Sequence, residues 1–374
     1  MAEASPSDVT PAEAAAPPVT TYPVQFTGEP GEYFRLWIVN VLLSVVTLGI
    51  YLPWARVRTR QYFYGHTWLD GQNFEYTANP VALLRGYLLV GVLFAAYSIS
   101  QQFQDYWWIT GLLGLLFFAL YPFLLYRSLR FNAANTIHRG LSFQFVGRPG
   151  GAYVAYLLIM LSVPFSLGLT FPLAVWMQRR YLLTHVAYGT TRAEFNKDVG
   201  VVYTIFLTAV AVMIAASVVV GVLALVGVVA AGGLGRLDDW FPNGGPEDSV
   251  VLFIILGVIA YVLLLLLYAS VGQYLRAALL RYSLQDLYLG RTLRLQTSLN
   301  PVRLAWINVS NVAVQLITLG LATPWAAIRR TRYLMAHLQV QTIASLDDFQ
   351  AAATPQESAL GEAASEFFNF DLGF

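Results

Sequence analysis

The chain has 374 residues, of which 57% are apolar and only 11% are charged, against about 25% charged in ordinary soluble domains. The net charge of +1 excludes the basic field that binds nucleic acid, and the lack of cysteine excludes disulfides, zinc thiolates and cysteine nucleophiles. The composition therefore predicts a polytopic membrane protein, and we expect neither a nucleic-acid partner nor a cofactor.

Residues 1–21 are rich in Ala, Pro, Ser and Glu and contain no Lys or Arg. A signal peptide needs a basic start and an apolar middle, so this stretch is predicted to be a disordered tail. At the other end, no Lys or Arg follows Arg332, and residues 346–374 are predicted to form a flexible acidic tail. The membrane domain is expected between them, over residues 22–345.

Seven apolar blocks lie in this domain, at residues 36–52, 82–100, 107–126, 152–171, 199–231, 250–271 and 303–322. Most of them reach the roughly 20 residues that a helix needs to cross a hydrocarbon core of about 30 Å. The blocks at 199–231 and 250–271 contain no Asp, Glu, Lys or Arg, which disfavours helices of a soluble core.

A short motif occurs three times in the chain. It reads TLGIYLPWA at residues 47–55, TLGLATPWA at residues 318–326 and, in a weaker form, SLGLTFP at residues 166–172. Each copy is followed by a tyrosine and, four residues later, by a histidine. Three of the four histidines lie at this position, which indicates internal repeats. The pairs are Tyr62 and His66, Tyr181 and His185, and Tyr333 and His337.

The repeats are predicted at residues 22–80, 141–198 and 292–345, separated by helical hairpins at 81–127 and 199–275. Alternating stretches at 72–77, 142–147 and 292–297 are predicted to be short strands that pair into small sheets. The predicted fold is an all-α polytopic membrane protein. It has two transmembrane helical hairpins, three repeated re-entrant or kinked membrane segments, and short cytoplasmic β-strands.

The TLGIYLPWA motif, the arginines after it and the Tyr-x-x-x-His pair resemble the YjgN-like family of bacterial inner-membrane proteins, a domain of unknown function. The resemblance covers roughly residues 22–345, and the second repeat departs most, with Leu173 where Trp54 aligns. It implies a multi-pass location in the bacterial inner membrane. It brings no substrate, reaction or catalytic residue.

The arginines predict which parts of the chain face the cytoplasm. If all seven blocks crossed, the basic loops at 172–198 and 272–302 would lie outside, against the positive-inside rule. If only the two hairpins cross and the repeat segments return to their own side, the outer loops are 101–106 and 232–249. All of the 22 Lys and Arg residues except Arg236 then lie inside. We favour this arrangement, with both termini cytoplasmic, and keep tilted full spans as the alternative.

The basic aromatic stretches after each motif provide the candidate binding residues. They combine Arg, which suits phosphate or carboxylate, with Trp and Tyr, which lie at headgroup depth. They are predicted to bind membrane lipids, anionic ones in particular, or to form a shared cytoplasmic site for a small anionic ligand. The candidates are Trp54, Arg56, Arg58, Arg60, Tyr62, His66, Arg179, Arg180, Tyr181, His185, Trp325, Arg329, Arg330, Arg332, Tyr333 and His337.

The repeated histidines and two asparagines suggest structural roles. No carboxylate accompanies the histidines at a fixed spacing, so we expect them to cap helix ends or bond a strand rather than to bind a metal. Asn40 and Asn311 lie within apolar segments, where such a side chain bonds a neighbouring helix or backbone freed near a break. Direct contact with a substrate is the alternative for the two asparagines.

Function is less determined than topology. Repeated segments with broken helices favour a channel or carrier for a small anionic or amphipathic solute. The alternative is a non-catalytic lipid-binding or membrane-organising protein, which the interfacial Arg and Trp residues favour. An enzyme is not expected, because no set of nucleophile, base and metal ligands is visible. Homo-oligomerisation is compatible with the sequence.

Overall fold

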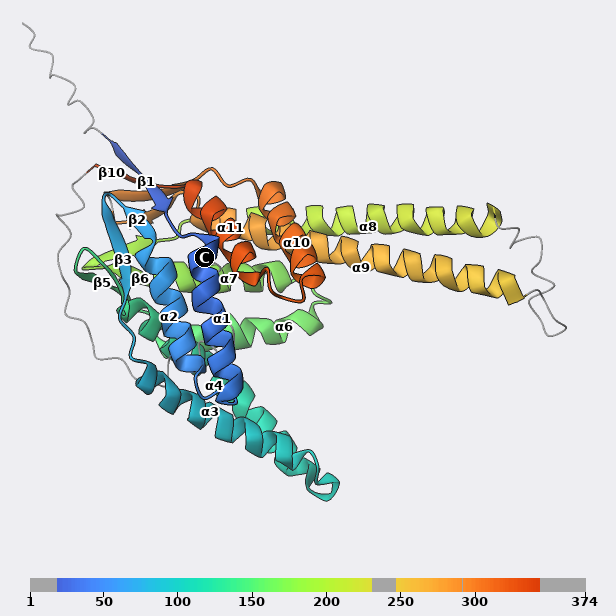
Figure 1. The fold of residues 1–374 in the computed structure, drawn as a ribbon, viewed down its shortest axis with the longest axis horizontal. Helices are drawn as coiled ribbons and strands as arrows, with labels where there is room; N and C mark the ends of the chain where they lie inside the picture. Colours follow the sequence, from blue (N-terminus) through green and yellow to red (C-terminus); the bar gives the residue numbers. More distant parts are fainter. Residues whose placement is uncertain (1–18, 231–246, 291, 344–374) are drawn as a thin grey trace, which may run out of the picture.

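The computed structural model describes residues 19–230, 247–290 and 292–343. The predicted acidic tail, most of the N-terminal tail and most of the predicted outer loop at 232–249, including Arg236, lie outside the described residues. In the described part, the order strand, helical hairpin, strand occurs five times in succession (Figure 1). These segments are termed units 1 to 5.

Units 1, 3 and 5 contain short helical hairpins, and units 2 and 4 contain long ones. Unit 1 consists of β1 (Thr20–Phe26), α1 (Pro30–Val46), α2 (Leu52–Gly65) and β2 (Thr67–Leu69). Unit 2 consists of β3 (Gln72–Tyr76), α3 (Pro80–Ser100), the 3-10 turn η1 (Gln104–Tyr106), α4 (Trp107–Ala134) and β4 (Thr136–His138). Unit 3 consists of β5 (Leu141–Phe145), α5 (Pro149–Tyr153), the π-helical η2 (Val154–Leu158), α6 (Ile159–Phe165), α7 (Phe171–Thr184) and β6 (Val186–Tyr188). Unit 4 consists of β7 (Thr191–Glu194), α8 (Val199–Ala230), α9 (Glu247–Leu284) and β8 (Leu287–Leu289), and unit 5 of β9 (Leu293–Thr297), α10 (Pro301–Ile317), α11 (Thr323–Ala336) and β10 (Leu338–Thr342).

The strands of all five units form one closed antiparallel barrel, in the order β1-β10-β9-β8-β7-β6-β5-β4-β3-β2. The two strands of each unit pair with each other, as Val24 does with Leu69 in unit 1. A short turn joins each unit to the next, and the pair Thr20 and Thr342 belongs to the β1–β10 ladder that closes the ring. The prediction of an all-α protein with small separate sheets is therefore wrong.

Strand length explains this error. Strands β2, β4, β6 and β8 have three residues each, too few to show the alternation by which strands are recognised. The predicted strands at 72–77, 142–147 and 292–297 correspond closely to β3, β5 and β9. Isolated pairs of such strands are marginal in water, whereas closing all of them into one ring removes the exposed edges.

Side chains fill the interior of the barrel. Leu69, Leu293 and Val340 belong to one buried cluster, against which Phe74 also packs. Strands β2 and β9 are not neighbours in the sheet, so this cluster crosses the interior. The ring of His138 stacks on that of Phe74, with the ring centroids 4.5 Å apart. The barrel is thus a small packed core from which the helical hairpins extend.

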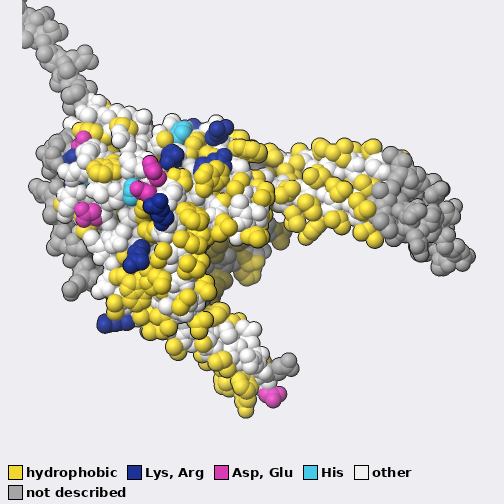
Figure 2. Space-filling model, viewed as in Figure 1, with side chains coloured by type: hydrophobic (Ala, Val, Ile, Leu, Met, Phe, Trp, Pro, Cys, Tyr) yellow, Lys and Arg dark blue, Asp and Glu magenta, His cyan; other side chains and the backbone are white. Residues whose placement is uncertain are grey.

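The two long hairpins project from the barrel in different directions (Figure 1). Among the described residues, four helices are long and apolar enough to cross a membrane, at Pro80–Ser100, Trp107–Ala134, Val199–Val229 and Ile254–Leu284. Figure 2 shows apolar side chains covering the projecting part of α8 and α9, while the Lys and Arg side chains visible on this face gather nearer the barrel. The long hairpins therefore present apolar surface to their surroundings.

Candidate lipid- and anion-binding site

The TLG motif, which reads SLG in unit 3, forms the turn of each short hairpin. The hydroxyl groups of Thr47, Ser166 and Thr318 accept a hydrogen bond from the backbone N–H four residues later, at 3.0, 3.0 and 3.1 Å. The glycine of the motif has a φ between 87° and 90° in all three copies, a conformation that glycine adopts readily. The motif proline lies in the first turn of the second helix, where its missing N–H is not needed.

The leucine of the motif is exposed at the tip of each turn. Leu48, Leu167 and Leu319 are 94%, 93% and 93% exposed, with φ angles of 50°, 51° and 50°. This left-handed conformation is unfavourable by roughly 1–2 kcal/mol for a residue other than glycine. Local backbone preference does not explain a leucine at this position, and these residues are termed the tip leucines.

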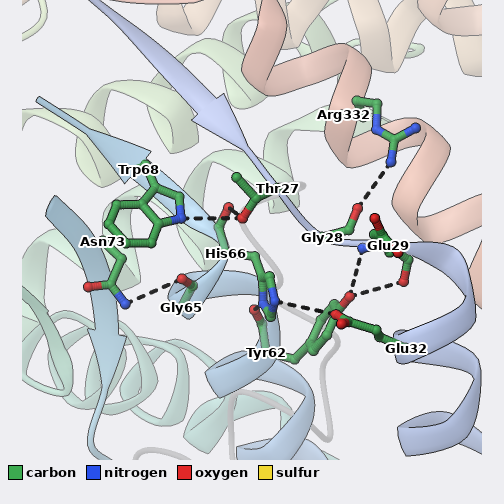
Figure 3. A network of polar contacts seen from close by, with 10 residues as sticks. All are labelled: Thr27, Gly28, Glu29, Glu32, Tyr62, Gly65, His66, Trp68, Asn73 and Arg332. Atoms are coloured by element: carbon green, nitrogen blue, oxygen red, sulfur yellow. Dashed lines mark hydrogen bonds and ion pairs between the residues drawn. The ribbon is translucent and has the colours of Figure 1, made fainter. Parts of the chain in front are cut away.

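A tyrosine and a histidine join the two helices of unit 1 at the barrel (Figure 3). The Tyr62 hydroxyl accepts a hydrogen bond from the N–H of Glu29 at 2.9 Å and donates one to its carbonyl at 3.0 Å. His66 ends α2, with its Nδ1 2.7 Å from the carbonyl oxygen of Tyr62. A spacing of four residues is about one helical turn, so both rings reach the same helix junction. This arrangement is termed the joint.

Units 3 and 5 contain the same joint. The Tyr181 and Tyr333 hydroxyls donate to the carbonyl that precedes the first helix of the unit, at 2.8 and 3.4 Å. The Nδ1 atoms of His185 and His337 each lie 2.8 Å from the carbonyl oxygen of the tyrosine four residues before. The structure thus places the predicted Tyr and His candidates at helix ends beside the barrel, where their contacts support a structural role.

Two related joints were not recognised in the sequence. In unit 4, the Tyr282 hydroxyl donates to the carbonyl of Asp198 at 2.8 Å, and Asp286 follows four residues later. In unit 2, the Asn135 side chain donates to the carbonyl of Phe131 at 2.9 Å. The spacing of four residues was the available signal, but Asn and Asp stand where the other units have His.

Asn40 and Asn311 are buried and connect the two helices of their hairpins. The Nδ2 of Asn40 donates to the carbonyl of Ala55 at 3.3 Å, and that of Asn311 to the carbonyl of Ala326 at 3.0 Å. Arg329 in turn donates to the Oδ1 of Asn311 at 2.8 Å. Both asparagines therefore hold a hairpin closed between its tip and its joint.

Two arginines of the predicted clusters connect neighbouring units. Arg60 of α2 donates to the Tyr76 hydroxyl at 2.6 Å and to the Asn132 Oδ1 at 2.5 Å, both in unit 2. Arg332 of α11 donates to the carbonyl of Gly28 in unit 1 at 3.1 Å (Figure 3). The latter contact joins the last unit to the first beside the pairing of β1 with β10.

Other candidate arginines stack on aromatic rings of their own hairpins. The guanidinium carbons of Arg58, Arg180 and Arg329 lie 5.7, 5.2 and 5.1 Å from the ring centroids of Tyr51, Trp176 and Trp325. Trp54 stacks on Tyr51, and Arg56 and Arg179 are half-buried on the same helices as their clusters. The clusters lie on α2, α7 and α11, one on each short hairpin, while Arg330 also lines a cavity between α9, α10 and α11.

Within the described ranges, no group of three or more His, Asp or Glu side chains is placed to hold a metal ion. The fourth histidine, His138, lies in the barrel wall with its Nδ1 3.3 Å from the Tyr188 hydroxyl. Burial lowers the pKa of His138. Sequence analysis gave this residue no role, because only the closed barrel reveals its buried position.

These features define a helical membrane protein built around a small barrel. The chain belongs to the DUF898 family, bacterial proteins of unknown function, whose family model matches residues 21–367. The resemblance found in the sequence motifs is thereby confirmed.

Curated relatives are named inner membrane protein YjgN. The relative from Salmonella typhimurium is 39% identical over 121 residues, which cover 32% of this chain and 30% of the relative. The relative from Escherichia coli is 32% identical over 131 residues, which cover 34% and 32%. The matched stretches thus span about a third of the length of these relatives. No solved structure shows significant similarity.

Proposed function

We propose that the protein binds lipids and organises the membrane, crossing it with two long hairpins and inserting three short hairpins into one leaflet. The observation that carries this proposal is the exposed tip leucine of each short hairpin, held in an unfavourable backbone conformation. A single exposed leucine is ordinary on a protein surface. Three equivalent leucines at hairpin tips suit a hydrocarbon environment.

The length of the short hairpins supports insertion to half the depth of the membrane. Helices of 14 to 17 residues, as in units 1 and 5, extend about 21–25 Å, less than the roughly 30 Å of a hydrocarbon core. The first arginines of the clusters, Arg56, Arg179 and Arg329, lie four, eight and six residues after the first residue of their helices, or about 6–12 Å along the helix axis. Long arginine side chains extend toward the headgroups from such a depth, so a tip near the middle of the bilayer is compatible with arginines that contact anionic headgroups.

The long hairpin of unit 2 ends in a different kind of surface. Its turn exposes Tyr106, Trp107 and Trp108 by 54%, 76% and 55%. Trp and Tyr are enriched at membrane–water interfaces, whereas the short hairpin of unit 1 exposes Val46 beside its tip leucine, by 78%. This contrast supports an interface at the end of the long hairpin and hydrocarbon at the ends of the short ones.

The closed barrel supports the proposal that all the segments that join units lie on one side of the membrane. Every hairpin leaves the barrel from one strand and returns to the neighbouring strand. Two crossing hairpins therefore leave the barrel and the basic clusters on the same face of the membrane. The positive-inside bias favours the cytoplasmic face.

The surface of α8 favours lipid contact over a path for a solute. The hydroxyl groups of Thr204, Thr208 and Ser217 donate to carbonyls one turn earlier in the same helix, at 3.0, 2.8 and 2.7 Å. These bonds satisfy the hydroxyl donors within the helix, and the Ser217 hydroxyl also lies 3.4 Å from that of Tyr268 on α9. A proton-coupled carrier usually needs an intramembrane carboxylate or histidine, which residues 199–231 lack. Lipid binding is therefore preferred to the channel or carrier hypothesis.

Depth measurement with single labels tests the proposal. Because the chain has no cysteine, Leu48→Cys, Leu167→Cys and Leu319→Cys can each carry one nitroxide label. We expect oxygen and nickel accessibilities to place all three labels near the bilayer centre, unreactive toward an impermeant thiol reagent from either side. Thr190→Cys, in the exposed turn between β6 and β7, is the control that should react from the cytoplasm. Reaction of a tip from the periplasm would show a full span and overturn the proposal.

A further inference from the structure

A cavity of about 320 Å³ lies where the long hairpin of unit 4 packs against the short hairpin of unit 5. Two arginines line it, Arg276 of α9 and Arg330 of α11. The amides of Gln273, Asn308 and Gln315 add hydrogen-bonding groups, and among the described residues no Asp or Glu is part of the lining. The cavity is therefore positively charged and rich in donors. It is termed the α9–α11 cavity.

The short hairpins provide an internal comparison for this lining. The spacing from the first proline to the glycine of the turn is the same in all three, so their positions correspond one to one. At the positions of Asn308 and Gln315, unit 1 has Trp37 and Ser44, and unit 3 has Tyr156 and Val163. Folding of a short hairpin therefore does not require amide side chains at these two positions.

Hydrogen bonds fix part of the lining between three helices. The Nδ2 of Asn308 donates to the Oε1 of Gln273 at 3.2 Å and so connects α10 to α9. Asn311, which also lines the cavity, is held by its bonds to the carbonyl of Ala326 and to Arg329 on α11. The polar groups thus converge from three helices that already contact one another, which reduces the ordering needed to bind a ligand.

We infer that the α9–α11 cavity binds the phosphate group of an anionic ligand, with Arg276 and Arg330 as the charged donors. Guanidinium groups match phosphate oxygens in bidentate geometry, and the amides can bond remaining oxygens or a hydroxyl group. The volume is at the small end of ligand pockets, and it suits a group of the size of a phosphoglycerol headgroup without acyl chains.

The surface beside the cavity offers a place for acyl chains. Val312 lines the cavity and Leu316 follows it by one turn of α10, with exposures of 48% and 72%. The same helix face leads toward the tip leucine Leu319. The inference that the phosphate belongs to a phospholipid rests on the proposed function. The alternative ligand is a soluble phosphate compound, which presents the same phosphate group without acyl chains.

Binding to the purified full chain in a neutral detergent tests this inference and separates the two sources. The probes are dioctanoyl phosphatidylglycerol, glycerol 3-phosphate and inorganic phosphate. Saturable binding of the lipid alone would identify a lipid headgroup, and saturable binding of the soluble anions as well would identify a free phosphate compound. Either result supports the inference if the arginines of the cavity carry the binding.

Arg276→Gln and Arg330→Gln are each expected to weaken binding of the responding probe at least tenfold. Arg276 is exposed, so its replacement should leave the fold intact. Arg330→Lys retains the charge and should lose less than Arg330→Gln, which separates ligand contact from a loss of packing. Arg303→Gln, on the exposed surface of α10 outside the cavity lining, is the matched control and should bind like the wild type.

The inference is overturned if no probe binds saturably, if both glutamine variants bind like the wild type, or if Arg303→Gln loses as much affinity as they do. The tip labels report separately on the proposed function. Inserted tips without saturable binding would overturn the phosphate site alone. Periplasmic reaction of the tips with intact, arginine-dependent binding would overturn the leaflet insertion and leave the phosphate site standing.

Discussion

The short and long hairpins start from similar joints and differ in the length of their helices. Units 1, 3 and 5 share the TLG turn (SLG in unit 3), the Tyr–His pair and a basic cluster. Units 2 and 4 keep the paired strands and the four-residue spacing of the joint, and their helices are apolar and of spanning length. The comparison indicates that the barrel with its joints is the common framework, while the helices beyond the joints can vary in length without disturbing the ring.

The largest effect on stability is expected when the tyrosine ring of a joint is removed. Tyr181 is buried in a cluster with Tyr126 and Phe145, and a Cβ built on Gly151 would lie 2.7 Å from its ring. Tyr181→Ala should lower the free energy of unfolding by about 3–5 kcal/mol. Tyr181→Phe, which loses only the hydrogen bond to Arg148, should lower it by about 1 kcal/mol.

Thermal unfolding in detergent, followed by circular dichroism, measures both variants of Tyr181. A melting temperature for Tyr181→Ala equal to that of the wild type would show that the joints do not hold the framework. Equal losses for the Ala and Phe variants would instead assign the effect to the hydroxyl group rather than to packing.

The second-largest effect on stability is expected at Lys197, the only lysine in the chain. Lys197 lies in unit 4, at the position that corresponds to Gly28 of unit 1. Its ammonium group donates to the carbonyl oxygens of Tyr282, Ser283 and Gln285 at the end of α9. Burial lowers the pKa of Lys197 from 10.5 to about 8. A titration of the isotopically dimethylated amine should therefore have a midpoint well below that of the unfolded chain, and a midpoint above pH 10 would contradict this prediction.

Stability should follow the same shift in pKa. Because the folded-state pKa is the lower one, the unfolded chain binds more protons between pH 8 and pH 10.5. The wild type should gain stability relative to Lys197→Met as the pH rises through this window, and the difference should be constant below it. Denaturant unfolding of both proteins at pH 7, 9 and 10.5 measures the change.

The smallest effect is expected from completing the joint of unit 2. Phe131 occupies the position where the other units have a tyrosine whose hydroxyl donates to the carbonyl before the first helix. Phe131→Tyr should add such a bond to Asn79 and raise the free energy of unfolding by about 0.5–1.5 kcal/mol. The reverse change, Tyr282→Phe in unit 4, should lower it by a similar amount. Destabilisation by Phe131→Tyr would show that the joints of long and short units are not equivalent.

Local sequence patterns located the hairpins but not the ring that unites them. The apolar blocks at 82–100, 107–126, 199–231 and 250–271 lie within or largely within α3, α4, α8 and α9, because length and composition decide whether a helix can cross a membrane. Closure of the barrel depends on the pairing of Thr20 with Thr342, and no local pattern reports a contact so distant in sequence. The units around the long hairpins were missed because Asn135 and Asp286 replace the expected histidine.

The candidate site shows the same division between local and distant information. Arg330 and Asn311 stood out in the sequence because they belong to the repeated segments, and both line the α9–α11 cavity. Arg276 and Gln273 were not among the candidates. They follow a long apolar stretch, and only the packing of α9 against α10 brings them beside Asn308.

The pairing of β1 with β10 has a consequence for biosynthesis. Strand β10 is translated after every other strand of the barrel, so β1 and β9 each have one unpaired edge until it leaves the ribosome. Contacts between residues so far apart in the chain form slowly, and open strand edges invite pairing with other chains. If the hairpins insert as proposed, those of units 1 to 4 can enter the bilayer one after another during this interval. Ring closure would then be the final step of assembly, and chains truncated before β10 should be recognised by their open edges as substrates for chaperones and proteases.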